Sequence, residues 1–249
     1  MISLQGICKR FANGVLALDG VNFRIPAEPQ FLSIVGPSGS GKTTLLRLLA
    51  GLESPGEGEI EWGLNGGRPH LAYVFQEPAL MPWATVYENV YLPLRIRGVS
   101  RSEATPKIMQ LLSRTGLDDF ASAYPRQLSG GMRMRASVAR ALATDPRLLL
   151  MDEPFAALDE ITRGKLERDL LNLWQESKLT VIFVTHSVFE AVFLAGRVAV
   201  MTPRPGRIAA DLTINLPYPR TESLRTSAAY IDCCREVSEA LAHAMAGQP

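Results

Sequence analysis

Short apolar runs bounded by polar or turn residues recur along the chain, and this pattern predicts β-strands. Alternating apolar positions over Ser3–Cys8 and Val15–Ile25 predict an opening pair of strands. The other apolar runs predict strands over Phe31–Val35, Glu57–Trp62, Leu71–Phe75, Arg147–Met151, Thr180–Thr185 and Arg197–Met201. Because helical patterns separate several of these runs, the sequence predicts an α/β fold whose sheet has a parallel core.

The middle of the chain has a different pattern, with no convincing strand and several helix starts. Thr85 and Glu88 fit a capping box, as do Ser100 and Glu103, in which a hydroxyl and a carboxylate satisfy each other's backbone N–H groups. Ser129 is placed to begin a third helix. These signals predict a helical region between two parts of the α/β core.

The domain prediction follows from this pattern. A length of 249 residues allows one α/β domain or two smaller ones. We interpret residues 1–249 as a single domain, in which residues 1–76 and 146–249 make the core and residues 77–145 make a helical subdomain. After Pro203 the chain is rich in proline, and a last helix is predicted over Glu222–Ala246.

A glycine-rich loop is the strongest chemical signal. Gly36–Thr43 fits the phosphate-loop pattern Gly-x-x-x-x-Gly-Lys-Ser/Thr, between the predicted strand Phe31–Val35 and a predicted helix over Thr44–Ala50. Strand, glycine loop and helix in this order are the context that the motif requires. A chance glycine-rich turn is the alternative, and the flanking elements make it less favourable.

The chemistry of this loop follows from its backbone. Gly36, Gly39 and Gly41 permit conformations and close approaches that a side chain would block, so that successive N–H groups face a phosphate at a helix N-terminus. Lys42 would reach the β- and γ-phosphates, and the Thr43 hydroxyl would hold Mg²⁺. The predicted nucleotide-binding residues here are Gly36, Pro37, Ser38, Gly39, Ser40, Gly41, Lys42, Thr43 and Thr44.

A second chemical element is an apolar run, Leu148–Met151, that ends in two carboxylates. Ligands of open α/β sheets bind at the carboxyl ends of strands, so Asp152 is placed to hold Mg²⁺ near a phosphate loop. Glu153 is a candidate general base that would polarise a water for attack on the γ-phosphate. The alternative is a strand that enters solvent through two acids, but the phosphate loop upstream favours function.

A third element is Leu128–Gly131, a glycine turn that opens a helix. Exposed N–H groups and the positive helix end make a second anion site, to which Ser129, Gly130 and Gly131 contribute. A simple helix cap is the alternative. One nucleotide needs two phosphate cradles only if they close on it from two sides, which predicts a head-to-tail dimer in which each copy completes the other's site.

Composition narrows the function classes. The formal net charge is +1, from 26 Lys and Arg against 25 Asp and Glu, which argues against a strongly basic nucleic-acid surface. No run of apolar residues is long enough to predict a membrane-spanning helix, and the N-terminus lacks the apolar core of a signal peptide. The cysteines are Cys8, Cys233 and Cys234, with neither metal-site nor disulfide-framework spacing, which fits a reducing cytoplasm.

Taken together, these motifs resemble the ATP-binding subunits of ABC transporters over nearly the whole chain. Gly36–Thr43 resembles Walker A, Leu128–Met132 the signature motif, Leu148–Glu153 Walker B with its catalytic glutamate, and Ala157–Asp159 the D-loop. The resemblance implies an α/β fold of the phosphate-loop NTPase (ABC ATPase) class, with a mixed sheet, an N-terminal antiparallel β-subdomain and a helical subdomain insert. It also implies ATP and Mg²⁺ as ligands.

The resemblance also assigns three single residues. Gln76 matches the Q-loop glutamine, which senses Mg²⁺ and the attacking water, and His186 matches the switch histidine that contacts the γ-phosphate. Phe11 takes the place of the aromatic residue that stacks on adenine. Met132 and Ser187 depart from the usual Gln and Asp, but the cradle requires neither replaced side chain, so an active ATPase is expected.

A finer resemblance points to importers of nitrate, sulfonate and taurine, carried by Phe75–Val90, Met151–Asp159 and Ala199–Arg207. Importers of thiamine precursors and of other small solutes share this pattern, so it does not identify the solute. The resemblance implies transmembrane permease subunits, an extracytoplasmic solute-binding protein and a peripheral location on the cytoplasmic face of the inner or plasma membrane. The apolar run Leu80–Trp83 either packs within the helical subdomain or receives a short helix of the permease. Two rivals are a soluble ABC-type ATPase of DNA repair or translation and a phosphate-loop kinase.

Overall fold

A computed structural model describes residues 1–63, 67–177 and 179–247. By residue contact the chain divides into two compact units: Met1–Pro69 with Lys178–Pro249, and His70–Ser177. The predicted subdomain boundaries at residues 76 and 146 differ from this division and stay a prediction. We call the two the first unit and the second unit.

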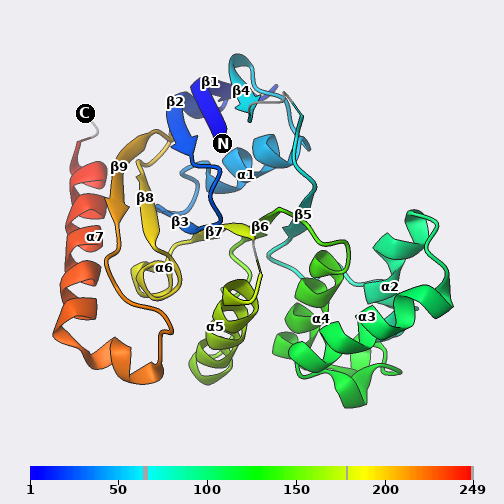
Figure 1. The fold of residues 1–249 in the computed structure, drawn as a ribbon. Coiled ribbons are helices and arrows are strands. Elements are labelled where there is room, and N and C mark those ends of the chain that lie inside the picture. The colour runs from blue at the N-terminus through cyan, green and yellow to red at the C-terminus, as the bar shows by residue number, and fades with distance from the viewer. Residues whose placement is uncertain (64–66, 178, 248–249) are drawn as a thin grey trace. The chain divides into compact units, whose positions relative to one another are not determined.

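The first unit begins with a small antiparallel sheet. Its strands are β1 (Ile2–Arg10), β2 (Leu16–Ile25) and β4 (Glu57–Trp62), in the order β2-β1-β4 (Figure 1). In the register of this sheet, Ile2 of β1 lies opposite Ile25 of β2 on one side and Trp62 of β4 on the other. The predicted opening pair of strands is therefore confirmed.

The first unit also holds a mostly parallel set of strands. β3 (Phe31–Val35) pairs in parallel with β7 (Thr180–Thr185) on one side and with β8 (Arg197–Met201) on the other. All of β3 is buried, as expected for a strand covered on both faces. β9 (Ile208–Thr213) runs antiparallel to β8, and the sequence analysis did not predict it.

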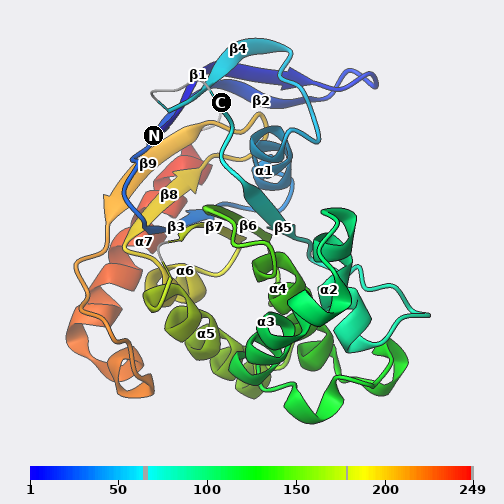
Figure 2. The ribbon, with the colours of Figure 1, turned by 45° about the vertical axis from the view of Figure 1, so that its right-hand side comes forward.

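Helices cover these strands. α1 (Lys42–Ala50) lies between the small sheet and β3 in both views (Figures 1 and 2). α6 (Val188–Leu194) packs on β3, and α7 (Ala228–Ala246) packs on α6 and β8. The predicted last helix over Glu222–Ala246 was wrong at its start: a 3₁₀ turn over Glu222–Thr226 comes first, and Ser227 caps α7.

The second unit is mostly helical. It contains the parallel pair β5 (Leu71–Val74) and β6 (Leu148–Asp152), together with α2 (Val86–Ile96), α3 (Arg101–Arg114), α4 (Gly130–Leu142) and α5 (Glu160–Gln175). Short 3₁₀ turns lie at Asp118–Phe120 and Pro125–Gln127. No strand lies between β5 and β6 in the described chain, as predicted.

Apolar side chains of α2, α3 and α4 form the core of the helical region, with Val90, Ile108, Leu112 and Ala139 among its buried members. The capping box of Thr85 and Glu88 begins α2, and its second hydrogen bond runs from Thr85 N to Glu88 Oε2 over 2.9 Å. At α3 the Ser100 hydroxyl accepts from Glu103 N. These helix starts were predicted from hydroxyl and carboxylate spacing alone.

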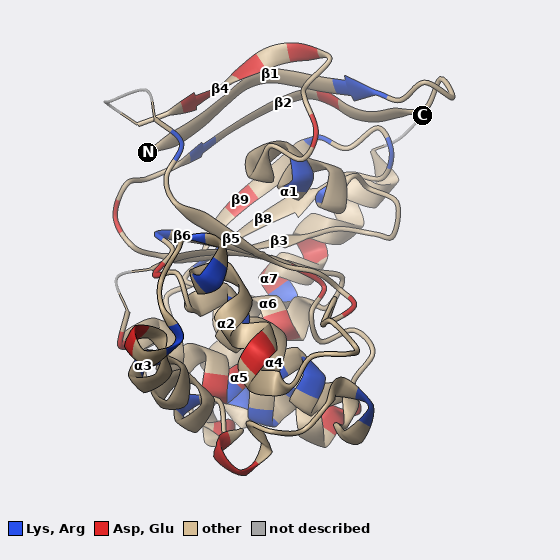
Figure 3. Ribbon diagram, turned by 90° about the vertical axis from the view of Figure 1, so that its right-hand side faces the viewer, with Lys and Arg blue, Asp and Glu red and all other residues tan. Residues whose placement is uncertain are grey.

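Basic and acidic residues are interspersed along the ribbon (Figure 3). The clearest exception is β4, where Glu57, Glu59 and Glu61 alternate along an exposed outer strand. Charged side chains on an edge strand discourage pairing with another chain. None of the described helices is both long enough and apolar enough to cross a membrane.

Candidate functional site

The glycine loop follows β3 and has the backbone that the motif predicts. Gly39 and Gly41 have φ angles of 78° and 92°, in the region that favours glycine. A Cβ on Gly41 would lie 2.8 Å from Ala17 O, and one on Gly36 would lie 2.9 Å from Ser40 Oγ. The loop therefore needs glycine at Gly39 and Gly41 for conformation, and at Gly36 and Gly41 for close packing.

Lys42 begins α1 and lies inside the loop. The residue is only 4% exposed, and its ammonium donates to the carbonyls of Gly36 over 2.8 Å and Pro37 over 3.0 Å. The cation is thus fixed across the mouth of the loop, where a phosphate would meet it.

The first turn of α1 is suited to an anion. Its N-cap is Gly41, no side chain of the described residues caps it by a hydrogen bond, and no acidic residue lies in the first turn. Within this turn, no carboxylate offsets the backbone N–H groups and the positive end of the helix dipole. Thr43 and Thr44 lie half-buried in this turn, and Ser38 is exposed at the tip of the loop.

Ser40 gives an independent test of the fit to a phosphate. Its hydroxyl is buried, and in the described part of the chain it has no hydrogen-bond partner. Buried polar atoms are normally paired, so an orphaned donor beside the cradle indicates a place for an oxygen-rich ligand. The loop is therefore compatible with the predicted nucleotide.

A loop over residues 202–207 supports the glycine loop, and the sequence analysis gave it no role. Gly206 donates its N–H to Ala17 O over 2.9 Å, and a Cβ on it would lie 2.0 Å from Ser40 O. Arg204 Nε donates to Gly39 O over 3.3 Å. The loop thus packs directly on the phosphate cradle.

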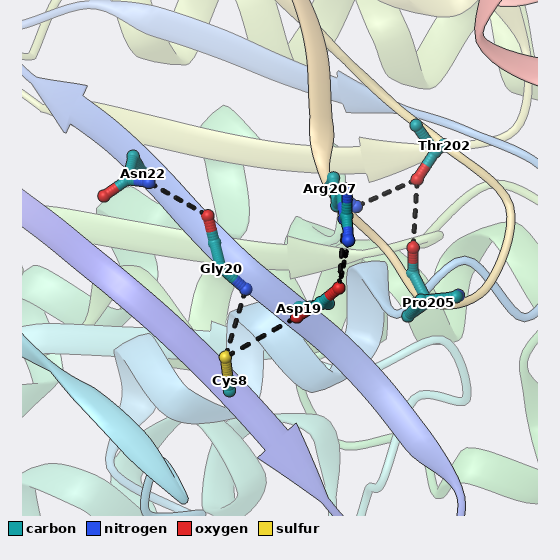
Figure 4. A network of polar contacts seen from close by, with 7 residues as sticks. All are labelled: Cys8, Asp19, Gly20, Asn22, Thr202, Pro205 and Arg207. Atoms are coloured by element: carbon teal, nitrogen blue, oxygen red, sulfur yellow. Dashed lines mark hydrogen bonds and ion pairs between the residues drawn. The ribbon is translucent and has the colours of Figure 1, made fainter. Parts of the chain in front are cut away.

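Figure 4 shows how the 202–207 loop is fixed. The Thr202 hydroxyl donates to Pro205 O over 3.1 Å and accepts from Arg207 N over 3.0 Å. Arg207 pairs with Asp19 on β2, and Cys8 Sγ on β1 accepts from Gly20 N over 3.1 Å. The Pro-Arg-Pro-Gly-Arg sequence was a signal for this loop, but its partners lie far away along the chain.

His186 follows β7 directly and is exposed. Ser187 caps α6 by accepting from Glu190 N over 3.3 Å. The Glu190 carboxylate accepts from the Thr185 hydroxyl on β7, which ties the first turn of α6 to the end of that strand. His186 is therefore held in a short bend between two tied elements.

Phe11 lies half-exposed in the turn after β1. Its N–H donates to Val15 O over 2.9 Å, and the Lys9 ammonium lies 5.5 Å from its ring centroid. The Lys9 cation therefore lies over one face of the Phe11 ring. Stacking of Phe11 on adenine stays a prediction, and it would use the other face.

In the second unit, a strand ends at the two predicted carboxylates. β6 ends at Asp152, one residue later than the predicted strand end at Met151. Asp152 is 6% exposed, and Tyr73 on β5 donates its hydroxyl to Asp152 Oδ2 over 3.0 Å. Tyr73 was missed in the sequence, because only the pairing of β5 with β6 brings it to Asp152.

Glu153 follows with a φ of 44°, which is rare for a residue other than glycine. Such outliers gather at functional sites, where surrounding structure holds them in place. This unusual backbone turns the chain at the end of β6, and Glu153 is only partly buried. Gln76 lies exposed just beyond β5.

The glycine turn at the start of α4 is also formed. Ser129 is exposed and caps the helix, its hydroxyl accepting from Met132 N over 3.2 Å. A hydroxyl that accepts one hydrogen bond still has its own proton to donate. Gly131 is buried, and a Cβ there would lie 2.6 Å from Thr162 Cγ2 on α5, whereas one on Gly130 would meet Leu158 at 3.5 Å.

The ABC transporter family pattern matches residues 18–156, more than half of the chain. The chain belongs to the ABC transporter ATP-binding family. It is 45% identical over 245 residues to a putative ATP-binding protein of Brucella abortus, covering 97% of this chain and 94% of that protein. The resemblance inferred from the motifs is therefore confirmed.

Two further relatives of this ABC ATPase carry names for a solute. One is a nitrate import ATP-binding protein of Synechocystis, 46% identical over 206 residues, which are 82% of this chain and 77% of that protein. The other is an aliphatic sulfonates import ATP-binding protein of Bacillus cereus, 40% identical over 230 residues, 89% of each.

Among solved structures, a dimeric ATP-binding cassette in a post-hydrolysis state with ADP and Pi has a TM-score of 0.75 and 33% identity. The match covers 87% of this chain and 100% of that one. The predicted ABC ATPase fold, with a mixed sheet and an antiparallel β-subdomain, is confirmed, and the chain is an ATPase that binds ATP.

The predicted Mg²⁺ ligands suit that ion by chemistry. Thr43, Gln76 and Asp152 offer a hydroxyl, an amide oxygen and a carboxylate, and Mg²⁺ prefers such hard oxygen donors. The described residues contain no group of three or more His, Cys, Asp or Glu side chains that could hold a metal ion by themselves. A set with one carboxylate fits an ion that also binds substrate phosphates.

Proposed function

We propose that this ABC ATPase powers a membrane importer for a small anionic solute of the nitrate, sulfonate and taurine class. The proposal is carried by similarity to two relatives named for nitrate import and for aliphatic sulfonates import. The family model itself spans residues 18–156, which include the glycine loop, the glycine turn at the start of α4 and the acidic strand end. The individual solute stays open between these anions.

The proposed mechanism assigns a role to each predicted site residue. The loop Gly36–Thr43 binds the phosphates, Lys42 stabilises charge on the transferring phosphoryl group, and Phe11 stacks on adenine. Bound Mg²⁺, held by Thr43, Asp152 and Gln76, would neutralise phosphate charge. The buried ammonium of Lys42 and the orphaned hydroxyl of Ser40 support these assignments.

Two residues complete the proposed chemistry. Glu153 accepts a proton from the attacking water, and His186 contacts the γ-phosphate as charge develops there. The positive φ of Glu153 and the tied bend around His186 support these roles, because both side chains are carried by constrained backbone.

A second copy is proposed to complete each nucleotide site. Ser129, Gly130 and Gly131 of one copy would face the phosphate loop of the other, in a head-to-tail dimer. The uncapped start of α1 and the remaining hydroxyl proton of Ser129 support this arrangement. A solved cassette at 33% identity is described as dimeric and bound to ADP and Pi.

The partners would be transmembrane permease subunits and, through them, an extracytoplasmic solute-binding protein. The ATPase would lie on the cytoplasmic face of the membrane. Trp83, 76% exposed after Leu80, supports a permease contact, whereas Leu80 itself packs on the helical core.

The shared site is tested with Glu153→Gln, which should bind ATP and Mg²⁺, stall and remain dimeric in sedimentation. Adding Ser129→Ala should abolish the ATP-dependent dimer. Ser100→Ala is the matched control, because Ser100 caps α3 as Ser129 caps α4. An equal loss in both variants, or unchanged turnover in Glu153→Gln, would contradict the mechanism.

Lys42→Ala should lose ATP binding or hydrolysis.

The importer assignment is tested by purifying the tagged chain from its native membranes and identifying the proteins that accompany it. Membrane permease subunits are expected, and vesicles containing the complex should take up nitrate, an alkanesulfonate or taurine only with ATP. Recovery of ribosomes or DNA-repair proteins, with ATPase stimulation by RNA or DNA, would instead favour the rival class.

A further inference from the structure

Side chains from the segment after β9 bind the main-chain carbonyls of α6. Tyr218 donates its hydroxyl to Leu194 O over 2.9 Å, and Tyr230 on α7 donates to Phe189 O over 2.9 Å. Arg220 is central, because its Nη1 donates to Val192 O, Phe193 O and Ala195 O over 2.7, 2.9 and 3.0 Å. The last turn of a short helix is thus held by one guanidinium.

Arg220 is well suited to this position. It is 5% exposed, and its burial lowers the pKa of the guanidinium from its ordinary value. A cation at a helix C-terminus interacts favourably with the helix dipole and satisfies carbonyls that have no partner within the helix. The ring of Tyr218 lies 4.1 Å from the guanidinium carbon, and Arg225 lies over Phe193 at 3.7 Å. The contact is built from several packed side chains.

The other end of α6 is tied to the bend that carries His186. Thr185 Oγ1 accepts from Ser187 N over 3.0 Å, and it donates to the Glu190 carboxylate. His186 lies between Thr185 and Ser187, so its backbone follows the first turn of α6. Because α6 spans only Val188–Leu194, roughly 10 Å at the rise of an α-helix, a shift at its last turn moves its first turn.

We propose that Arg220 is a positioning residue for hydrolysis, acting through α6 on His186. The inference rests on the role given to His186 under the proposed function. Arg220 touches no nucleotide in this scheme; it fixes the helix whose start sets where the imidazole meets the γ-phosphate. Small displacements of such a group lower the rate of the chemical step more than they weaken substrate binding.

The experiment uses the full-length chain and measures kcat, the KM for ATP and the thermal midpoint. Arg220→Met should lower kcat about tenfold and change KM less than about twofold, because the loop that binds ATP is untouched. Arg220→Lys, which keeps a cation and donors, should recover part of the rate. Arg235→Met on α7 is the matched control, since Arg235 is exposed and forms its ion pair with Asp232, three residues away on the same helix.

A second comparison separates positioning from general destabilisation. In a His186→Ala background, Arg220→Met should lower kcat no further, because the group it positions is absent. A loss of the same fold in both backgrounds would overturn the proposal, as would a wild-type kcat in Arg220→Met. If Arg220→Met does not fold, Arg220→Lys and Tyr218→Phe decide in its place, and wild-type kcat in both would overturn it.

The two proposals fail in different ways. A wild-type kcat in His186→Ala would remove the role of His186 and thus the proposed mechanism at that residue. A slow His186→Ala enzyme together with a normal Tyr218→Phe, Arg220→Lys and Arg220→Met series would leave that role intact and refute positioning by Arg220 alone.

Discussion

The hydroxyl of Tyr73 donates to Asp152 Oδ2 over 3.0 Å, which joins neighbouring strands β5 and β6 at the acidic strand end. Asp152 is a proposed Mg²⁺ ligand. Groups that hydrogen-bond a metal-ligating carboxylate orient it, and their loss commonly costs ten- to a hundredfold in metal affinity. We therefore expect Tyr73→Phe to raise the Mg²⁺ concentration for half-maximal ATPase activity by about tenfold.

Tyr91→Phe is the control for this variant. Tyr91 also lies in the second unit and donates its hydroxyl over 2.8 Å, but to the main-chain carbonyl of Val99. Its Mg²⁺ titration should match the wild type. Equal shifts in the two variants would mean that Tyr73 acts through the fold and not through Asp152.

The glycines at the start of α4 should differ in their tolerance of alanine. A Cβ on Gly131 would lie 2.6 Å from Thr162 Cγ2, whereas one on Gly130 would have ordinary contact with Leu158. Overpacking costs about 1–3 kcal/mol, so Gly131→Ala should lower the unfolding free energy in urea by that amount. Gly130→Ala should change it by less than about 1 kcal/mol.

The clash itself can be tested by rescue. Thr162→Ser removes the Cγ2 methyl but keeps the backbone N–H that Asp159 binds. The double variant Gly131→Ala with Thr162→Ser should regain most of the lost stability. If the double variant is no more stable than Gly131→Ala alone, the contact with Thr162 is not the cause.

Elements with strong local signals were predictable from the sequence. β3 is a fully buried apolar run, and α2 and α4 begin at Thr85 and Ser129, whose side chains accept from the first turn of the helix. The chemistry of the glycine loop was equally local, since its donors and its lysine are adjacent in sequence.

Long-range contacts account for what the sequence did not reveal. β9 follows two prolines, and its alternate residues are only half-buried. The alternation that predicts a strand was therefore masked in the sequence. Arg204, Tyr73 and Arg220 gain their meaning from partners on other elements. Nothing in the local pattern distinguishes buried Arg220 from the exposed arginines of this chain.

The N-cap of α5 should make the free energy of unfolding depend on pH in the acid range. Asp159 Oδ1 accepts from Thr162 N over 2.9 Å, and this backbone hydrogen bond lowers the pKa of Asp159. Because the pKa of Asp159 is lower in the folded than in the unfolded chain, its carboxylate stabilises the fold at pH values above the unfolded pKa of about 3.9. This stabilisation is lost as the pH falls through the pKa of the folded state.

Asp159→Asn should therefore flatten the fall of unfolding free energy in the acid range, because asparagine still caps a helix but does not titrate. Denaturant unfolding between about pH 5 and pH 2 measures the slope. Glu239→Gln, on an exposed position of α7, is the control. The idea is wrong if the slope is the same in Asp159→Asn and in the wild type.

Trp83 should contribute to membrane-partner binding more than to the fold. Its side chain is 76% exposed, so Trp83→Ala should keep the thermal midpoint but lower the yield of membrane subunits recovered with the tagged chain. Ile231→Ala, at an exposed apolar position on α7, should keep that yield. Full recovery with Trp83→Ala would place the permease contact elsewhere.

The contact of Arg204 with the glycine loop predicts an effect on nucleotide affinity. Arg204 Nε donates to Gly39 O over 3.3 Å, from a loop that Arg207 and Asp19 fix to β2. Loss of this donor should let Gly39 leave the conformation, with φ of 78°, that aims its neighbours' N–H groups at a phosphate. A long hydrogen bond that is exposed to solvent contributes roughly 0.7 kcal/mol, near the low end of the usual range, so Arg204→Met should raise the KM for ATP about threefold.

The decisive measurement is the split between KM and kcat. Because Arg204 fixes a binding loop and not Glu153 or His186, the KM for ATP should rise in Arg204→Met while kcat stays within about twofold. Arg204→Lys cannot place a donor at the Nε position and should behave like Arg204→Met. If kcat falls and KM does not, the loop over residues 202–207 acts on the chemical step and not on the phosphate cradle.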